Sequence, residues 1–332
     1  MKEENLQDLI AEIDRILRQA ERALVVSHIN PDGDSIGSSL AVAQYLRDLG
    51  KEVVLVREDD IPDKYQFLQG ADRYPQREEY DPAPSVDTAV VLECPNPDRM
   101  GSVADMLGED TVVVNIDHHL GNTEYGSINW IDLEASSVGE MITRYFVEVG
   151  YSMSPATADQ LFTAILTDTG RFRFPSTSKH TMEMAGHLIK SGARPHAIAS
   201  RVYFDMPIST IRLTGRVLND IEYYDDDRFC FLALTQDKLK ESGAEASESE
   251  GLVDFVLYGR GVRAGALLKE VDANTTKVSL RSVKEIDVSK VANTFGGGGH
   301  INAAGCTLEM PMDQAREEIL DLLRQADNGR KE

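Results

Sequence analysis

The sequence predicts an α/β protein, with an N-terminal domain built on a parallel sheet and a smaller C-terminal α/β domain with a mixed sheet. Short apolar runs rich in β-branched residues alternate with helical stretches through the first half, as in parallel sheets that are covered on both faces. From Arg228 onward, several strand-like runs follow one another before a terminal helix. The 332 residues also suit two domains, at about 100–200 residues per domain.

In the first half, an amphipathic helix is expected within residues 1–24, because apolar side chains recur on one helical face. These side chains are Leu6, Leu9, Ile10, Ile13, Ile16 and Leu17. Strands are then predicted at 23–28, 52–56, 87–93 and 111–117. The stretch 35–50 between the first two strands has helical composition and ends in a glycine that suits a helix C-terminus.

The rest of the chain predicts further helices and then a second sheet. Helices are expected at 137–150, 155–170 and 178–191, and near 205–222. Strands follow at 229–234, 263–271 and 276–282, with helices at 288–297 and 312–326 and an exposed acidic loop at 240–251. We therefore predict a first domain at 1–190, a helical linker at 191–215 and a second domain at 216–332.

Charge and composition narrow the classes of partner. The net charge of −22 comes from 34 basic and 56 acidic side chains, and such a surface repels a long polyanion such as duplex DNA. A small anion in a locally positive pocket stays possible, particularly where bound cations supply charge. The sequence has no run of about 18 apolar residues, and its first residues lack the features of a signal peptide, so we expect neither a membrane helix nor a signal peptide. Three widely spaced cysteines suggest buried thiols in a reducing cytoplasm.

Acids and histidines follow the predicted strands, and ligands bind beyond the carboxyl ends of strands in open α/β sheets. His28 ends the first strand, and Asp32 and Asp34 lie in the turn after it. A histidine and two carboxylates on a tight turn can converge on a divalent cation. The alternative is that the two aspartates only shape the turn and cap the next helix.

Three more segments carry such groups to the same predicted edge. Glu93 ends the third strand, the triplet Asp117, His118 and His119 directly follows a buried strand, and Asp168 follows an apolar helical run. Each has an ordinary structural alternative, such as an acid at a strand end or a buried histidine pair. Together the segments offer enough donors for two cations that share a bridging carboxylate, an arrangement suited to phosphoryl displacement.

The last candidate segment is a glycine-rich run that could bind phosphate. Gly297, Gly298 and Gly299 precede His300, and glycines permit close backbone approach and an anion-binding nest. The run lacks the Gly-Lys-Ser/Thr ending of a Walker motif, so it is either a phosphate site or a flexible loop. Arg281 in the preceding strand favours phosphate binding, although it could equally be a solvated strand residue.

Five motifs occur in order: HINPDGDSIGSS, DHH, LTDTGRF, LRS and GGGGHINAAG. In this combination the chain resembles the DHH phosphoesterase superfamily, in the branch with a DHH-associated C-terminal domain and of the NrnA-like oligoribonuclease/pAp phosphatase (nanoRNase) type. The resemblance covers nearly the whole chain, and it implies that residues 1–190 form the catalytic, metal-binding domain and residues 216–332 the substrate-binding domain. It implies a cytoplasmic enzyme that binds two divalent cations, Mn²⁺ or alternatively Mg²⁺ or Co²⁺, in an active site in the interdomain cleft. It is compatible with a homodimer.

The resemblance also implies roles for single residues. His28 and Asp32 would hold one cation, Asp34, His118 and Asp168 the second, and Glu93 would bridge both. Asp117 would support the site or be a weaker ligand, and His119 would contact the scissile phosphate. The phosphate or nucleotide end would be bound by Arg281, Gly297, Gly298, Gly299 and His300.

The implied reaction is hydrolysis of short oligoribonucleotides, of 3′-phosphoadenosine 5′-phosphate, or of both, by a water activated by two metals. Related alternatives are hydrolysis of linear or cyclic dinucleotides and of inorganic pyrophosphate or polyphosphate. The sequence departs from the family at one position, because Glu93 stands where Asp is usual. This substitution could alter metal spacing or rate, or could mark a non-catalytic nucleotide-binding regulator.

Overall fold

A computed structural model describes residues 3–81, 83–249, 251–283 and 286–328. Its contacts divide the chain between Asp205 and Met206 into an N-terminal and a C-terminal unit. Residues 191–205 of the predicted linker pack with the first unit, and residues 206–215 with the second. Among the described helices, none is both long and apolar enough to span a membrane.

The N-terminal unit contains a five-stranded sheet in the order β2-β1-β3-β4-β5, with every strand pair parallel. The strands are β1 (Arg22–Val26), β2 (Glu52–Leu55), β3 (Thr88–Leu92), β4 (Val112–Asp117) and β5 (Ile128–Ile131). The first four match the predicted strands within two residues. β5 was missed because it is a four-residue edge strand in which only Trp130 is buried.

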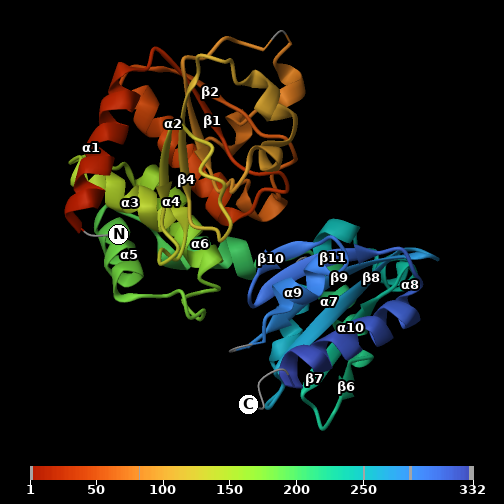
Figure 1. Ribbon diagram of the computed structural model, residues 1–332. Coiled ribbons are helices and arrows are strands. Elements are labelled where there is room, and N and C mark those ends of the chain that lie inside the picture. The colour runs from red at the N-terminus through yellow and green to blue at the C-terminus, as the bar shows by residue number, and fades with distance from the viewer. Residues whose placement is uncertain (1–2, 82, 250, 284–285, 329–332) are drawn as a thin grey trace. The chain divides into compact units, whose positions relative to one another are not determined.

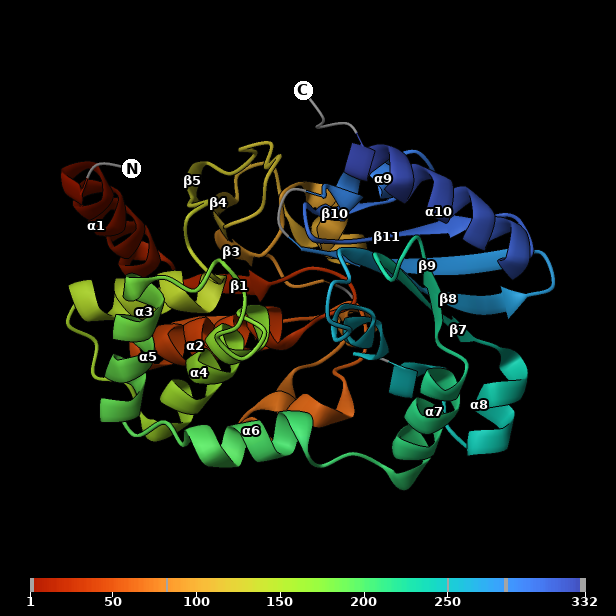
Figure 2. The same cartoon turned by 90° about the horizontal axis from the view of Figure 1, so that it is seen from below.

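Alternate residues of the strands contribute to two separate cores, which is why the strand sequences are mostly apolar. Val25 and Val90 lie in the core beneath the helices, whereas Leu24 and Val91 lie in a second core on the opposite face. The 3₁₀ segment Pro97–Met106 supplies Met100, Val103 and Met106 to that second core. Helices α2 to α5 gather on the first face (Figure 2).

The helices of this unit are α1 (Glu3–Gln19), α2 (Gly33–Asp48), α3 (Val138–Glu148), α4 (Pro155–Asp168), α5 (Lys179–Lys190) and α6 (Pro195–Tyr203). α6 was not predicted separately. Its start is fixed by Asp159, which accepts hydrogen bonds from the Arg194 backbone (2.8 Å) and guanidinium. The strand order reverses between β1 and β3, and ligands of doubly wound sheets bind at such a reversal.

The C-terminal unit contains a six-stranded sheet in the order β10-β11-β9-β8-β7-β6, in which only β7 and β8 run parallel. The strands are β6 (Glu222–Tyr224), β7 (Phe229–Leu234), β8 (Ala264–Asp272), β9 (Thr275–Ser282), β10 (Gly298–His300) and β11 (Ala303–Leu308). The sheet is mixed, as predicted. The helix predicted at 288–297 ends at Asn293, before the glycine run. The last glycines of the run belong to strand β10.

Helices cover both faces of this second sheet (Figures 1 and 2). α9 (Val288–Asn293) and α10 (Met312–Asn328) pack on one face, and α7 (Ile208–Asn219) and α8 (Gln236–Ser242) lie on the other. The prediction of an exposed loop at 240–251 was wrong in part, because α8 extends to the buried Ser242 and a 3₁₀ turn buries Ser249. Residue 250 lies outside the described residues.

Candidate metal centre

The candidate residues of the N-terminal unit come from the carboxyl ends of three neighbouring strands and from two helices. His28 lies two residues after β1, Glu93 directly follows β3, and His118 directly follows β4. Asp34 lies in the first turn of α2, whose N-cap is Asp32. Asp168 is the last residue of α4.

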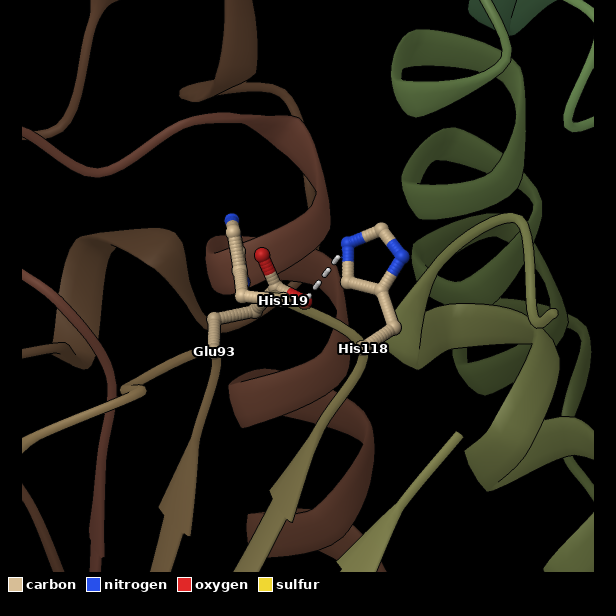
Figure 3. A group of neighbouring side chains, drawn as sticks. All are labelled: Glu93, His118 and His119. Carbon is tan, nitrogen blue, oxygen red and sulfur yellow. Dashed lines mark ion pairs between the residues drawn. The ribbon is translucent and has the colours of Figure 1, made fainter. Parts of the chain in front are cut away.

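These side chains form three overlapping groups whose ligand atoms lie within 4.8 Å of one another. The groups are His28, Asp32 and Glu93; Asp34, His118 and Asp168; and Glu93, His118 and His119. His118 Nε2 lies 3.4 Å from Glu93 Oε1 and 3.4 Å from Asp168 Oδ2. Figure 3 shows Glu93 and His118 facing each other from the ends of β3 and β4. The residues that the family resemblance assigns to two cations therefore gather at one edge.

Two histidines are oriented so that Nε2 points into the group. His28 Nδ1 lies 2.7 Å from the Ile29 carbonyl oxygen, and His118 Nδ1 lies 3.1 Å from the Ala135 carbonyl oxygen. A carbonyl oxygen can only accept, so each Nδ1 carries the proton and donates it. The remaining nitrogen, Nε2, is then the one with a lone pair for a cation.

The two aspartates of α2 combine structural and candidate ligand roles. Asp32 caps α2, since its Oδ1 accepts from the Ser35 backbone N–H at 3.0 Å. Asp34 is fully buried and accepts from the backbone N–H groups of Val138 (2.6 Å) and Gly139 (2.8 Å) at the start of α3. The two aspartates therefore have the structural roles that the alternative predicted. These roles are compatible with metal binding, because the same hydrogen bonds orient both carboxylates toward the candidate centre.

Asp117 serves the site through His119. Its Oδ1 lies 2.7 Å from His119 Nδ1 and accepts from the His118 backbone N–H at 2.9 Å, while Oδ2 accepts from Asn122 Nδ2 at 2.7 Å. Burial by itself raises the pKa of Asp117, but the hydrogen bonds and charge of His119 outweigh it and hold the pKa below the ordinary value. Asp117 thus stays ionised and orients the His119 ring.

Among the other carboxylates, burial by itself raises the pKa of Asp32, but His28 and the hydrogen bond from the Ser35 backbone outweigh it and lower the pKa, whereas the pKa values of Glu93, Asp168 and Asp34 are raised. Burial and the neighbouring Asp34 and Asp168 raise the pKa of Glu93 well above the ordinary value. Burial, together with Asp34 and Asp32, raises the pKa of Asp168 to about 8, although His118 opposes the shift. Burial likewise raises the pKa of Asp34. The raised pKa values show that the protein by itself does not fully compensate the negative charge of Glu93, Asp168 and Asp34.

Divalent cations fit this donor set. Glu93 Oε1 is buried and accepts no hydrogen bond from the described part of the chain. Buried carboxylates are normally paired with positive charge or hydrogen-bonded. Carboxylate oxygens with imidazole nitrogens suit Mn²⁺- or Zn²⁺-type ions, and a bound cation would stabilise the ionised carboxylates. The centre therefore qualifies as a candidate metal site.

In the C-terminal unit, strand register aligns the predicted phosphate-binding residues. Arg281 pairs with Ala303 and Ala303 with His300, so all three side chains lie on one face of the sheet. Arg281 Nε also lies 3.1 Å from Asp254 Oδ1, and His300 is exposed. These residues and the metal centre belong to different units.

The glycines before His300 have a packing role. A side chain at Gly297 or Gly299 would overlap the backbone of β11, so only glycine lets β10 lie against its neighbour. Gly298 faces open space apart from Asn293. The phosphate-binding role of these glycines stays a prediction.

Sequence reasoning missed three polar residues beneath the centre. Asn115, Asn122 and Tyr125 link Asp117 to the turn that carries Glu93. One signal was present, because Asn115 interrupts the otherwise apolar run of β4. A buried amide within an apolar strand needs hydrogen-bond partners, and this predicts a polar network nearby.

Two family models match the chain. Residues 22–166 match the N-terminal domain of the DHH family, and residues 226–327 match the DHHA1 domain.

Similar proteins cover nearly the full length. The chain is 33% identical over 323 residues to the bifunctional oligoribonuclease and PAP phosphatase NrnA of Thermus thermophilus, covering 96% of this chain and 93% of the relative. It is 26% identical over 314 residues to the NrnA protein of Bacillus subtilis, covering 94% and 96%. Among solved structures, an exopolyphosphatase-related protein from Bacteroides fragilis superposes with a TM-score of 0.92 at 27% identity, covering 98% of each chain.

Proposed function

The chain belongs to the DHH family, with a DHHA1 domain after its DHH domain, and from this membership we propose that it is a metal-dependent phosphoesterase. Its proposed substrates are short oligoribonucleotides and 3′-phosphoadenosine 5′-phosphate. The substrate class rests on the names of full-length relatives. The observation that carries the chemistry is the set of three overlapping groups of carboxylates and imidazoles, in each of which the ligand atoms lie within 4.8 Å of one another.

Two divalent cations, Mn²⁺ in the first place, are the proposed cofactors. His28 and Asp32 would hold one, Asp34, His118 and Asp168 the other, and Glu93 would contact both. Such a pair supplies an activated water and neutralises charge on a phosphate. The protein's own contribution is to hold the ligands in place, through the α3 N-terminus for Asp34 and the two carbonyl acceptors for His28 and His118.

His119 is the proposed proton-handling residue. The Asp117 carboxylate holds its Nδ1–H, so Nε2 is the ring atom that can donate a proton to the leaving oxygen. Because Asp117 is ionised and buried, it would stabilise the doubly protonated, positively charged imidazole before its Nε2 proton passes to the leaving oxygen and the ring becomes neutral. His119 therefore acts on the phosphate and Asp117 acts through His119.

Substrate length is proposed to be set by the C-terminal unit. Arg281 and His300, two strands apart on one sheet face, would bind the phosphate of a nucleotide end. Gripping one end while cleaving at the cations favours substrates of a few nucleotides. The net charge of −22 adds to this preference, since it disfavours long polyanions.

A substrate panel tests the proposal. The purified protein is incubated with Mn²⁺, Mg²⁺ or Co²⁺ and, separately, RNA of two to five nucleotides, pAp, pApA, cyclic di-AMP or pyrophosphate. Release of mononucleotides from short RNA, or of phosphate from pAp, supports the proposal. Preferential cleavage of cyclic di-AMP or pyrophosphate replaces the substrate assignment. Binding without cleavage, also after Glu93→Asp, favours a regulatory protein.

Variants separate the roles of the two units. Asp34→Asn and His118→Ala are expected to abolish turnover, because each removes a proposed cation ligand. His300→Ala is expected to raise KM about tenfold or more with little change in kcat, because it removes binding remote from the bond that breaks. Steady-state kinetics with a dinucleotide RNA decides, and unchanged KM in His300→Ala refutes the phosphate site.

A further inference from the structure

A polar network that the proposed mechanism does not use lies beneath the metal centre. The side chain of Asn122, in the loop after β4, is half-buried and contacts two parts of the site. Its Oδ1 accepts from the Glu124 backbone N–H at 2.7 Å, which fixes the direction of the amide. Its Nδ2 must then point inward as a donor.

On one side, this donor acts on the Asp117–His119 pair. Asn122 Nδ2 donates to Asp117 Oδ2 at 2.7 Å, and the other carboxylate oxygen, Oδ1, contacts His119 Nδ1 at 2.7 Å. The carboxylate therefore lies between Asn122 and His119. Removing the amide would leave a buried oxygen without this donor and would let the carboxylate rotate away from the imidazole.

On the other side, the same NH₂ group reaches the turn that carries Glu93. It donates to Asn115 Oδ1 at 2.9 Å, and Asn115 Nδ2 in turn lies 3.2 Å from the carbonyl oxygen of Cys94, the residue after Glu93. Tyr125 donates its hydroxyl hydrogen to that oxygen, also at 3.2 Å. Glu93 has a φ of 62°, a left-handed conformation that persists only when its surroundings hold it.

We propose that Asn122 is a positioning residue that holds two parts of the centre in register: the Asp117–His119 pair through Asp117 Oδ2, and the turn of Glu93 through Asn115 and the Cys94 carbonyl. The proposal rests on the proposed function for its kinetic test. Its structural part concerns Mn²⁺ affinity and can be measured without turnover.

The experiment compares Asn122→Ala with a matched control in the same loop. Thr123→Val removes the hydrogen bond from Thr123 Oγ1 to the Pro95 carbonyl (3.2 Å) and leaves the hydrogen bonds of Asn122 to Asp117 and Asn115 in place. Both changes are made in the wild-type and His119→Ala backgrounds. The readouts are kcat and KM for a dinucleotide RNA at saturating Mn²⁺, the Mn²⁺ dissociation constant by calorimetry, and the melting temperature.

Asn122→Ala is expected to lower kcat about 10–100-fold and to weaken Mn²⁺ binding about tenfold, as losses around a metal site typically do. KM should change less than about threefold, because the amide does not bind substrate. In the His119→Ala background, the further loss of kcat should fall to less than about threefold, since both changes act on one proton-handling pair. Thr123→Val should match its parent in every readout.

Three results would overturn the proposal: an unchanged Mn²⁺ dissociation constant in Asn122→Ala, an undiminished kcat, or a loss of kcat that is equally large without His119. If the wild type cleaves no panel member, the proposed function fails, but the Mn²⁺ affinities still decide the role of Asn122. If Asn122→Ala does not fold, Asn122→Asp replaces it. That variant keeps an acceptor for the Glu124 N–H and sets an oxygen against Asp117, so full activity in it would refute the role.

Discussion

Glu93 is a proposed cation ligand that also has an unusual backbone conformation. Its N–H donates to the Ile116 carbonyl at 3.1 Å, which extends the β3–β4 pairing by one residue, and its φ of 62° then turns the chain away. Left-handed backbone favours Asp and Asn over longer side chains. The usual Asp of the family would therefore suit this turn, and the glutamate is accommodated because three donors lie within 3.5 Å of the Cys94 carbonyl behind it.

The variants Glu93→Gln and Glu93→Asp should separate the effect of the negative charge on Mn²⁺ binding from the effect of side-chain length. Gln keeps the length but removes a buried carboxylate, so Mn²⁺ affinity should fall about tenfold or more while the metal-free protein becomes no less stable. Asp keeps the charge and suits the backbone, so Mn²⁺ binding should persist. Calorimetry and melting in chelator measure both effects. Equal Mn²⁺ affinity in Glu93→Gln would remove Glu93 from the ligand set.

At the scale of elements, the crossing of α2 and α4 sets the width of the centre. α2 carries Asp34 in its first turn, and α4 ends in Asp168. The two helices touch at Gly37, where a Cβ atom would overlap the backbone carbonyl of Gln160. A backbone carbonyl within a helix cannot move aside cheaply, so the contact fixes the helix separation and, through it, the distance between the two carboxylates.

Gly37→Ala should therefore destabilise the protein by about 1–3 kcal/mol, as overpacking of a core does, and should also weaken Mn²⁺ binding by moving Asp34 away from Asp168. Gly186→Ala is the matched control. It lies in α5 with nothing near its Cβ position and should stabilise the protein by about 0.5–1 kcal/mol. Urea unfolding of both variants, with wild type alongside, makes the comparison. A stable Gly37→Ala protein would contradict the close-contact argument.

At the scale of the whole molecule, acidic side chains outnumber basic ones, and several of the acidic side chains lie in the candidate metal centre. In the candidate centre, Asp34, Glu93 and Asp168 lie close together, and burial raises the pKa of each of these three carboxyl groups. Without cations, ionising them opposes folding. Bound cations would use the same charges as ligands and offset this cost, so stability and metal binding should be linked through pH.

The metal-free protein should lose stability as pH rises. Asp168 has an ordinary pKa of 3.8 and a folded pKa of about 8, so between these values the folded state holds a proton that the unfolded state has released. Each such proton lowers the free energy of unfolding by about 1.4 kcal/mol per pH unit. Glu93, Asp34 and His118 have raised pKa values and act in the same direction.

Melting temperatures between pH 5 and pH 8.5, in chelator and in Mn²⁺, measure this linkage. The protein in chelator should melt at lower temperature as pH increases, and Mn²⁺ should flatten the dependence and release protons on binding. Asp168→Asn should reduce the slope in chelator. A metal-free melting temperature that rises over this range would contradict the assigned directions.

The sequence by itself determined the layout of the N-terminal unit and the place of its site. Strands buried on both faces are apolar at most positions, with no polar alternation, so β1, β3 and β4 could be recognised without a structure. Parallel strands end at a common edge, which is why acids and histidines far apart in the chain could be assigned to one place. Short edge strands such as β5 and β10 carry too few buried residues to be recognised.

Only the tertiary structure decided how those residues are held. The left-handed turn at Glu93, the grip of Asp34 on α3 and the Asn122 network each depend on contacts between segments separated by about 5 to 105 positions. Arg281 and His300 share a sheet face only because of the register of β9, β11 and β10. A sequence pattern indicates which side chains are buried and which lie at the end of a strand. Hydrogen-bond direction is set by partners that no local pattern specifies.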